Sequence, residues 1–255
     1  MRLPGAGRLR WKAHQVTRWV RSRVAPGALI LLYHRVADVP SDPWGLSVTP
    51  EHFAEQMAVL CQKAYPMPLR EMAHALQHKE PLPRRAVAVT FDDGYADNLH
   101  EAQPILERFD VPATIFLVSG SLGCAREFWW DELDRMLLQP GRLPQTLHLA
   151  FGAERCRWSL GEAAHYTLEE AQQHRRWRVE DGPPPTPRHA LYLDLWTRLH
   201  PLPVAERDEI LSEIRAWATL PLAGRPGNFP LSSEETLRLA ESDLIELGAH
   251  TVNHT

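Results

Sequence analysis

The sequence predicts an α/β fold with a parallel sheet or an α/β barrel, and two observations indicate it. Apolar runs of strand length at residues 28–34, 86–91 and 113–119 alternate with helical patterns over the first half of the chain. That alternation is typical of parallel strands, whose crossovers are usually helices. A fourth run of this kind, residues 244–249, follows after a long interruption. Four core strands are too few to close an eight-stranded barrel.

The helices between these strands are predicted from caps and periodicity. Thr49 and Pro50 are typical of a helix start, and Phe53, Met57 and Leu60 then fall on one helical face. The other predicted helices cover residues 69–77, 96–109 (interrupted by Pro104), 128–138, 188–200, 204–218 and 233–241.

The regular alternation stops between residues 120 and 231, which we interpret as a large insertion in one domain, residues 28–255. Within it, residues 146–160 alternate apolar and polar side chains around a "GAE" turn, which predicts a hairpin. The proline-rich residues 181–187 predict a rigid linker.

The bulk composition is that of an ordinary globular protein, with 44% hydrophobic and 24% charged residues. A net charge of −4 gives no overall attraction to nucleic acid, so none is expected as a partner. Cys61, Cys124 and Cys156 are odd in number and widely spaced, which argues against a disulfide framework or a cysteine zinc site.

Residues 1–27 form a basic leader, with seven Arg and Lys side chains and no acid in the first 24 positions. Trp11, Trp19, Val20 and Val24 can share one face of an amphipathic helix, which allows peripheral membrane contact. A solvated leader that packs loosely on the domain is the alternative. No signal-peptide or membrane-spanning run is seen, so a cytoplasmic location is expected.

Two adjacent acids, Asp92 and Asp93, end the buried strand at residues 86–91. Neighbouring carboxylates repel one another unless a positive charge lies between them. Gly94 allows the chain to turn there, at the carboxyl end of a parallel strand, where α/β folds keep their active sites. The alternative is a helix N-cap beside a surface acid.

A metal ion bound by His250 and His254 is a candidate for that positive charge. They follow the last predicted strand at i, i+4 spacing, which on a helical turn places both imidazoles on one face. Two His and one carboxylate form a common open metal site. One of the two acids, Asp92 or Asp93, then ligates the metal and the other acts as a base beside it.

At this point the sequence resembles the polysaccharide deacetylases, carbohydrate esterase family four, with the NodB homology domain. "TFDDG" and "HTVNH" are similar to the first two family motifs, and "LLYHRV", "PATIFLV" and "IELGAH" resemble family strands. The resemblance covers about residues 28–120 and 232–255. It implies an irregular (β/α) barrel that is incomplete here, because the later family motifs lie beyond the second one; a fragment or a degraded relative is expected.

Carried over by position, the resemblance makes Asp93, His250 and His254 the ligands of a divalent metal, expected to be Zn²⁺. Asp92 becomes the general base. The metal would lower the pKa of its bound water, and the resulting nucleophile would attack the acetyl carbonyl of an N-acetylated sugar.

The resemblance also assigns two further roles. A backbone N–H near Tyr95 would hold the oxyanion, and His34 would be the general acid, as in the branch that acts on poly-N-acetylglucosamine. A core histidine satisfied by the backbone is the alternative for His34. Trp129 and Trp130 can stack on sugars, although their amphipathic helix predicts that at least one is core.

Three functions remain open. The first is a metal-dependent hydrolase that removes N-acetyl groups from an amino-sugar polysaccharide, such as an exopolysaccharide, or a glycan precursor. The second is a truncated, non-catalytic relative that binds glycan or a partner protein. The third is a barrel glycosidase that uses Asp92 and a distant acid, which leaves both histidines unexplained.

Overall fold

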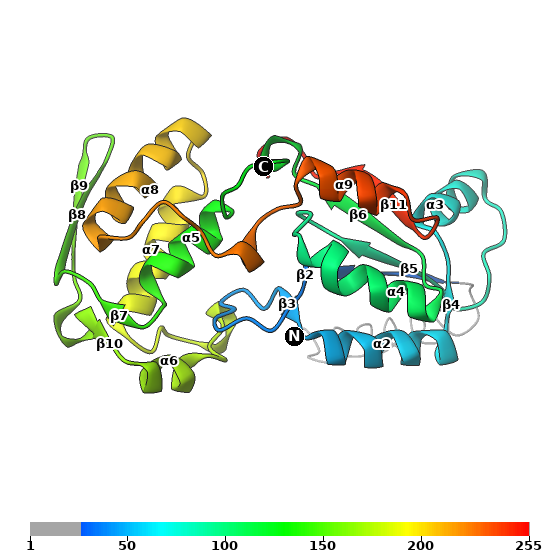
Figure 1. The fold of residues 1–255 in the computed structure, drawn as a ribbon, viewed down its shortest axis with the longest axis horizontal. Coiled ribbons are helices and arrows are strands. Elements are labelled where there is room, and N and C mark those ends of the chain that lie inside the picture. Colours follow the sequence, from blue (N-terminus) through cyan, green and yellow to red (C-terminus); the bar gives the residue numbers. More distant parts are fainter. Residues whose placement is uncertain (1–26, 255) are drawn as a thin grey trace, which may run out of the picture.

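The computed structural model describes residues 27–254 and contains one five-stranded parallel sheet (Figure 1). The strands run in the order β1–β5–β6–β11, and β4 pairs with the start of β5. They are β1 (Ala28–Tyr33), β4 (Tyr65–Pro66), β5 (Ala86–Phe91), β6 (Ala113–Leu117) and β11 (Ile245–Ala249). The parallel α/β class and all four predicted strands are confirmed. Within the described residues the sheet is open, so the parallel sheet of the expected incomplete barrel is present and the barrel itself is not confirmed.

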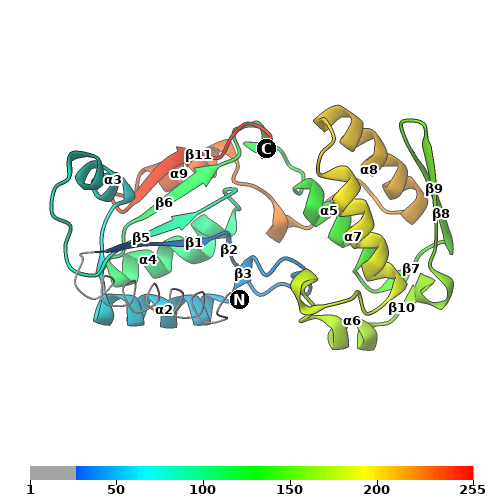
Figure 2. The same cartoon turned by 180° about the vertical axis from the view of Figure 1, so that it is seen from behind.

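Four helices accompany the sheet, and the first of them begins after Thr49, as its predicted cap indicates. They are α2 (Pro50–Lys63), α3 (Leu69–His78), α4 (Gln103–Phe109) and α9 (Ser233–Ala240). Thr49 Oγ1 accepts the N–H of His52 at 3.3 Å, and Phe53, Met57 and Leu60 are buried. Helices α2 and α4 lie side by side along the sheet, as both views show (Figure 1; Figure 2).

The predicted helix over residues 96–109 is divided. Its first part is a π-helical turn, Asn98–Ala102, and α4 follows with Pro104 in its first turn. Proline has no N–H to donate to the preceding turn, and the wider turn accommodates that missing hydrogen bond. The interruption at Pro104 is therefore confirmed.

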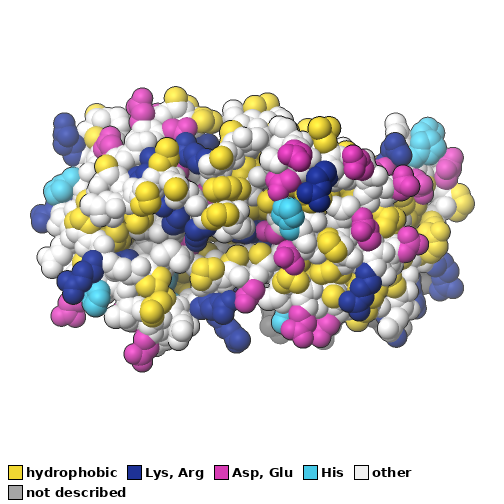
Figure 3. All heavy atoms as spheres, viewed as in Figure 1, with side chains coloured by type: hydrophobic (Ala, Val, Ile, Leu, Met, Phe, Trp, Pro, Cys, Tyr) yellow, Lys and Arg dark blue, Asp and Glu magenta, His cyan; other side chains and the backbone are white. Residues whose placement is uncertain are grey.

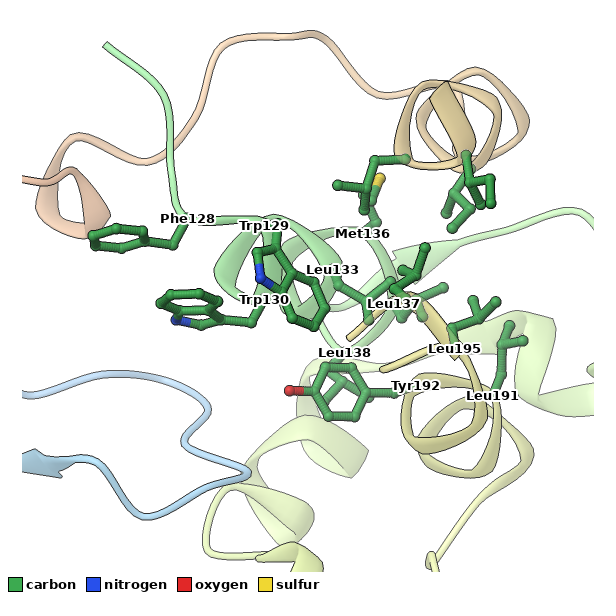
Figure 4. Close-up of a cluster of buried hydrophobic side chains, with 14 of the residues drawn as sticks. Phe128, Trp129, Trp130, Leu133, Met136, Leu137, Leu138, Leu191, Tyr192 and Leu195 are labelled. Atoms are coloured by element: carbon green, nitrogen blue, oxygen red, sulfur yellow. The ribbon is translucent and has the colours of Figure 1, made fainter. Parts of the chain in front are cut away.

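The chain between β6 and α9 leaves the sheet and builds a second lobe with its own apolar core. The lobe contains helices α5 (Trp129–Leu137), α6 (Leu168–His174), α7 (Pro187–Leu199) and α8 (Val204–Ala218) and the hairpin β8 (Thr146–Phe151) with β9 (Glu154–Ser159). Side chains of α5 and α7 meet in its centre (Figure 4). The helices α5, α7 and α8 and the hairpin are confirmed, whereas α6 was not predicted.

Short strand pairs complete the fold. They are β2 (Arg35–Val36) with β3 (Ser47–Val48), and β7 (Gly141–Arg142) with β10 (His165–Tyr166). On the face seen in Figure 3, acidic and basic side chains are interspersed over both lobes.

The predicted basic leader lies outside the described residues, apart from residue 27. Among residues 27–254, no helix combines the length and the apolar character that a membrane crossing needs.

Strand β1 is an edge of the sheet in the described part of the chain, because it pairs only with β5. Leu29, Ile30 and Leu32 are more than half exposed on it. An exposed apolar edge strand can pair with another chain, so this edge is the part of the fold most open to association.

We predict that Gly248→Ala destabilises the fold by about 1–3 kcal/mol, the usual cost of overpacking. A Cβ at Gly248 would lie 2.5 Å from Cδ1 of Phe116, on the neighbouring strand β6. Urea denaturation measures the free energy of unfolding. Gly227→Ala is the control, because a Cβ there meets nothing within 4 Å. Equal stability of the two variants would contradict the close packing of β11 on β6.

Candidate metal centre

The three predicted ligands converge at the carboxyl end of the sheet. Asp93 follows β5, His250 follows β11, and these two strands flank β6. Nε2 of His254 lies 3.2 Å from Oδ1 of Asp93, and Nε2 of His250 lies 3.8 Å from the same atom. One ligand atom from each residue falls within 4.8 Å of the other two. The parallel topology therefore brings together residues more than 150 positions apart.

The backbone at Asp93 is turned out of the strand in a way that sequence spacing alone does not reveal. Asp93 and Gly94 both have positive φ, at 73° and 75°. Such angles are uncommon for residues other than glycine, although aspartate tolerates them better than most. A Cβ on Gly94 would also lie 2.5 Å from Cδ2 of Leu117. Glycine at position 94 thus lets the chain turn immediately after the acid.

The two histidines come together through a turn, which corrects the predicted helical turn. Thr251 and His254 have φ of 60° and 57°, values outside the right-handed helical region. The N–H of His250 donates to the carbonyl of Leu117 at 2.7 Å, which fixes the start of the turn against β6. The two rings lie 5.1 Å apart at an interplanar angle of 60°. The i, i+4 spacing correctly predicted that the two histidine rings lie close together, but the predicted helical conformation between them was wrong.

The electrostatics of the cluster suit a cation. Asp93 is 3% exposed, and its Oδ1 is buried without a hydrogen-bond donor among the described residues. A buried carboxylate oxygen without a partner is costly, and a bound cation removes that cost. Two imidazoles and one carboxylate are a donor set that Zn²⁺ and related metals accept, with coordination positions left open.

The second lobe reaches this cluster through α5. The Trp130 ring lies 4.7 Å from that of His254, and its indole N–H donates to the Tyr95 hydroxyl at 2.7 Å. The Tyr95 hydroxyl in turn donates to Oδ2 of Asp131 at 2.7 Å. Trp129 and Trp130 are both buried, which confirms that at least one is core. No motif or spacing in the sequence indicated the Tyr95–Asp131 contact.

Asp131 is a titratable group in this network with a strongly shifted pKa. Burial raises its pKa to about 7, and the nearby Arg35 guanidinium, 3.8 Å from Oδ1, opposes part of that rise. Arg35 is itself held by Asp97, with Nε 3.0 Å from Oδ2, and donates to the carbonyl of Gly227 at 2.6 Å. Its guanidinium also lies over the Tyr95 ring, 4.4 Å from the centroid. Arg35, two residues after β1, therefore contacts both lobes.

The remaining predicted site residues lie outside the three-residue cluster. Asp92 is half-buried next to Asp93, and its backbone N–H donates to the carbonyl of Tyr33 at 3.0 Å. His34 is also half-buried, and its carbonyl accepts the Asn98 side-chain amide at 3.0 Å. Neither side chain has a hydrogen bond or ion pair with another described residue. The Tyr95 N–H likewise donates to no described backbone carbonyl.

Comparisons with known proteins point to one family. Residues 79–141 match the family model described as polysaccharide deacetylase. YxkH of Bacillus subtilis (strain 168), a protein named after the polysaccharide deacetylases, is 28% identical over 127 residues. The match covers 49% of this chain and 44% of that protein.

Two further relatives extend the comparison. The poly-β-1,6-N-acetyl-D-glucosamine N-deacetylase of Escherichia coli (strain K12) is 35% identical over 88 residues, or 34% of this chain and 13% of that protein. Among solved structures, IcaB from Ammonifex degensii matches 82% of this chain and 90% of its own, with 18% identity and a TM-score of 0.37. The chain thus spans less than half the length of the two sequence relatives.

We predict that the metal-free chain binds one Zn²⁺ ion and that Asp93→Asn and His250→Ala weaken binding by more than the roughly 10–100-fold typical of an outer-sphere change. Each removes a donor atom of the cluster. Titration calorimetry measures the affinity. Asp110→Asn and His148→Ala are matched controls on exposed residues elsewhere. Affinity that survives both cluster substitutions would place the metal elsewhere.

We predict that Asp131 makes the folded protein less stable as pH rises from its ordinary pKa of 3.8 towards about 7. The folded state keeps a proton there that the unfolded state releases, so the free energy of unfolding falls across this window. Asp131→Asn cannot titrate, so the wild type should lose stability relative to this variant between these values. Urea denaturation at a series of pH values measures the difference.

The control for the pH series is Asp243→Asn, at an exposed position. Its stability should follow the wild type at every pH. If the curve of Asp131→Asn also runs parallel to the wild type, Asp131 does not carry the raised pKa.

Proposed function

We propose that this chain, which matches the polysaccharide deacetylase family model over residues 79–141, is a metal-dependent hydrolase that removes N-acetyl groups from an amino-sugar glycan. The observation that carries the proposal is the buried Asp93 Oδ1, which lacks a donor and faces two imidazole nitrogens. That combination favours a bound cation over a purely structural carboxylate.

In this proposal Asp93, His250 and His254 hold the divalent metal, which we infer to be Zn²⁺. When bound in such a site, Zn²⁺ acts as a Lewis acid and makes water a stronger nucleophile at neutral pH. The histidines are about one-third exposed, so a ligand can approach from their side. Asp93 is buried and supplies the negative charge of the ligand set.

Asp92 is the residue we assign as general base. It is adjacent to Asp93, is only half-buried, and has no competing partner among the described residues. Its main chain is fixed at both ends, because its N–H donates to Tyr33 and its carbonyl accepts the N–H of Gly94 at 3.0 Å. A carboxylate held in this way can take a proton from the attacking water.

Two groups complete the proposed site. The N–H of Tyr95 is unused by the described backbone and is assigned to the oxyanion of the tetrahedral intermediate. His34 is assigned as the acid that protonates the leaving amine. Its main chain is anchored by Asn98, which leaves the ring free to face the substrate.

The name of one relative supports the substrate class that we propose. One of them is named for the N-deacetylation of poly-β-1,6-N-acetyl-D-glucosamine, and we propose a glycan of N-acetylated amino sugars for this chain. Acetate release is measured from chito-oligosaccharides and from β-1,6-linked oligomers of N-acetylglucosamine. The comparison shows which linkage between the sugars the chain prefers.

We predict that Asp92→Asn keeps Zn²⁺ binding but lowers acetate release by about 10²–10⁴-fold, the usual contribution of a general base. Asp93→Asn should lose both. Acetate release by the Zn²⁺-loaded chain and calorimetry of the same variants measure the two effects, with Asp110→Asn as control.

The alternative, a non-catalytic relative, predicts that the wild type binds Zn²⁺ tightly and releases no acetate from either oligomer. Full activity of Asp92→Asn would contradict the assigned base. Activity that persists after complete removal of metal by chelation would contradict the proposed chemistry.

A further inference from the structure

A small cavity adjoins the metal cluster on the side of the second lobe. Its volume is about 170 Å³, and its lining includes His254, Trp129, Trp130, Asn253 and Arg207. Trp129 and Trp130 come from α5, where they lie next to each other (Figure 4). The cavity is smaller than the roughly 300–1,000 Å³ of pockets that enclose whole drug-sized ligands. It therefore suits a single chemical group of a larger ligand.

Arg207, in the first turns of α8, is the unusual member of this lining. It is 7% exposed, and its Nε is buried without a hydrogen-bond partner. Its guanidinium lies 5.0 Å from the centre of the Trp129 ring, and the described residues offer it no hydrogen bond or ion pair. A buried N–H of a charged group that lacks a partner is unfavourable, and a cation–π contact offsets only part of that cost.

The other buried arginines of the described chain are all satisfied. Arg35 bonds Asp97, Arg135 bonds Glu127 at 2.8 Å, and Arg188 donates to main-chain carbonyls, including Ala163 at 2.6 Å. Burial without a partner is therefore not the general condition of arginine in this fold. It is particular to Arg207.

The acids that share the cavity are engaged with other cations. Glu127 accepts from Nε of Arg135 and, at 2.7 Å, from Nε of Arg225. Asp208 lies 3.2 Å from Nη2 of Arg126. Burial lowers the pKa of Arg207; the charge of Asp208 opposes this shift and that of Arg126 adds to it. Asp208, the acid whose charge acts on Arg207, is thus shared with Arg126, and no described acid forms an ion pair with Arg207.

We propose that this cavity is a subsite for an oxyanion group, a carboxylate or a phosphate carried by the glycan, with Arg207 as its counterion. An arginine guanidinium recognises such groups through paired N–H donors, and an oxyanion would satisfy the buried charge. Because His254 lines the same cavity, the charged group would sit next to the sugar that the metal cluster receives. The link to a glycan rests on the proposed function; the anion site does not.

The first test is thermal unfolding of the metal-free full chain with inorganic phosphate or glucuronate, with chloride at equal ionic strength as reference. We expect each anion to raise Tm of the wild type in a saturable way. In Arg207→Met this rise should require at least about tenfold more anion, since a charge-assisted pair is lost. The Tm of Arg207→Met without anion should equal or exceed that of the wild type, because an unpaired buried charge is removed.

Arg155→Met is the control, because it removes an exposed arginine from β9 and should leave the anion effect unchanged. An equal anion-dependent rise in the wild type and Arg207→Met, or no rise in the wild type with either anion, would overturn the proposal. If Arg207→Met has a lower Tm than the wild type without anion, and the anions raise the Tm of both proteins equally, Arg207 has only a structural role in packing on Trp129, which overturns the proposal. If Arg207→Met does not fold, Arg207→Lys replaces it, and an unchanged anion affinity there overturns the proposal.

The second test separates the subsite from the proposed activity. The Zn²⁺-loaded chain is given a neutral N-acetylglucosamine oligomer and one that also carries a uronate or phosphate, and kcat/KM is measured for both. Arg207→Met should lower kcat/KM about tenfold for the charged oligomers only. Whether uronate or phosphate is preferred identifies the source of the oxyanion. No acetate release from any oligomer, with the Tm effect intact, would refute the activity and leave the anion site standing.

Discussion

The buried Asp93 carboxylate is the constraint on which the rest of this site depends. It lies at the end of β5 with one oxygen lacking a donor, and it is the atom that both His250 and His254 face. Removing a carboxylate from water without compensation is expensive, so Asp93 needs a positive charge beside it, which a bound cation or a protonated imidazole supplies. The positive φ of Asp93 and the glycine after it follow from the same requirement, since the side chain must leave the strand direction.

The second lobe is part of this site rather than an appendage. Trp130 packs on His254 and donates to the Tyr95 hydroxyl, which bonds Asp131 of the same helix. Outer-sphere contacts of this kind orient metal ligands. The residues of α5 therefore link the position of the second lobe to the geometry of the cluster of Asp93, His250 and His254, and α8 adds Arg207 to the same surroundings.

Much of this arrangement could be predicted from the sequence, and the failures have physical reasons. The strand before Asp93 and the helix capped by Thr49 were predicted because burial and capping are local signals. Strand β4 was missed because two residues, one of them proline, carry no strand pattern. The prediction of a helical turn between His250 and His254 was wrong, because residue spacing determines neither the φ angles nor the tertiary contact with Leu117.

Contacts between the lobes had no sequence signal at all, because they depend on how Trp130 of α5 meets Tyr95 and His254 in the folded chain. The central claim is that Asp93, His250 and His254 ligate one metal ion. X-ray absorption at the zinc edge of the loaded chain tests it most directly. We predict two imidazole ligands with the remaining scatterers oxygen, and one imidazole fewer in His254→Ala. A sulfur scatterer, or a spectrum unchanged in His254→Ala, would contradict the account.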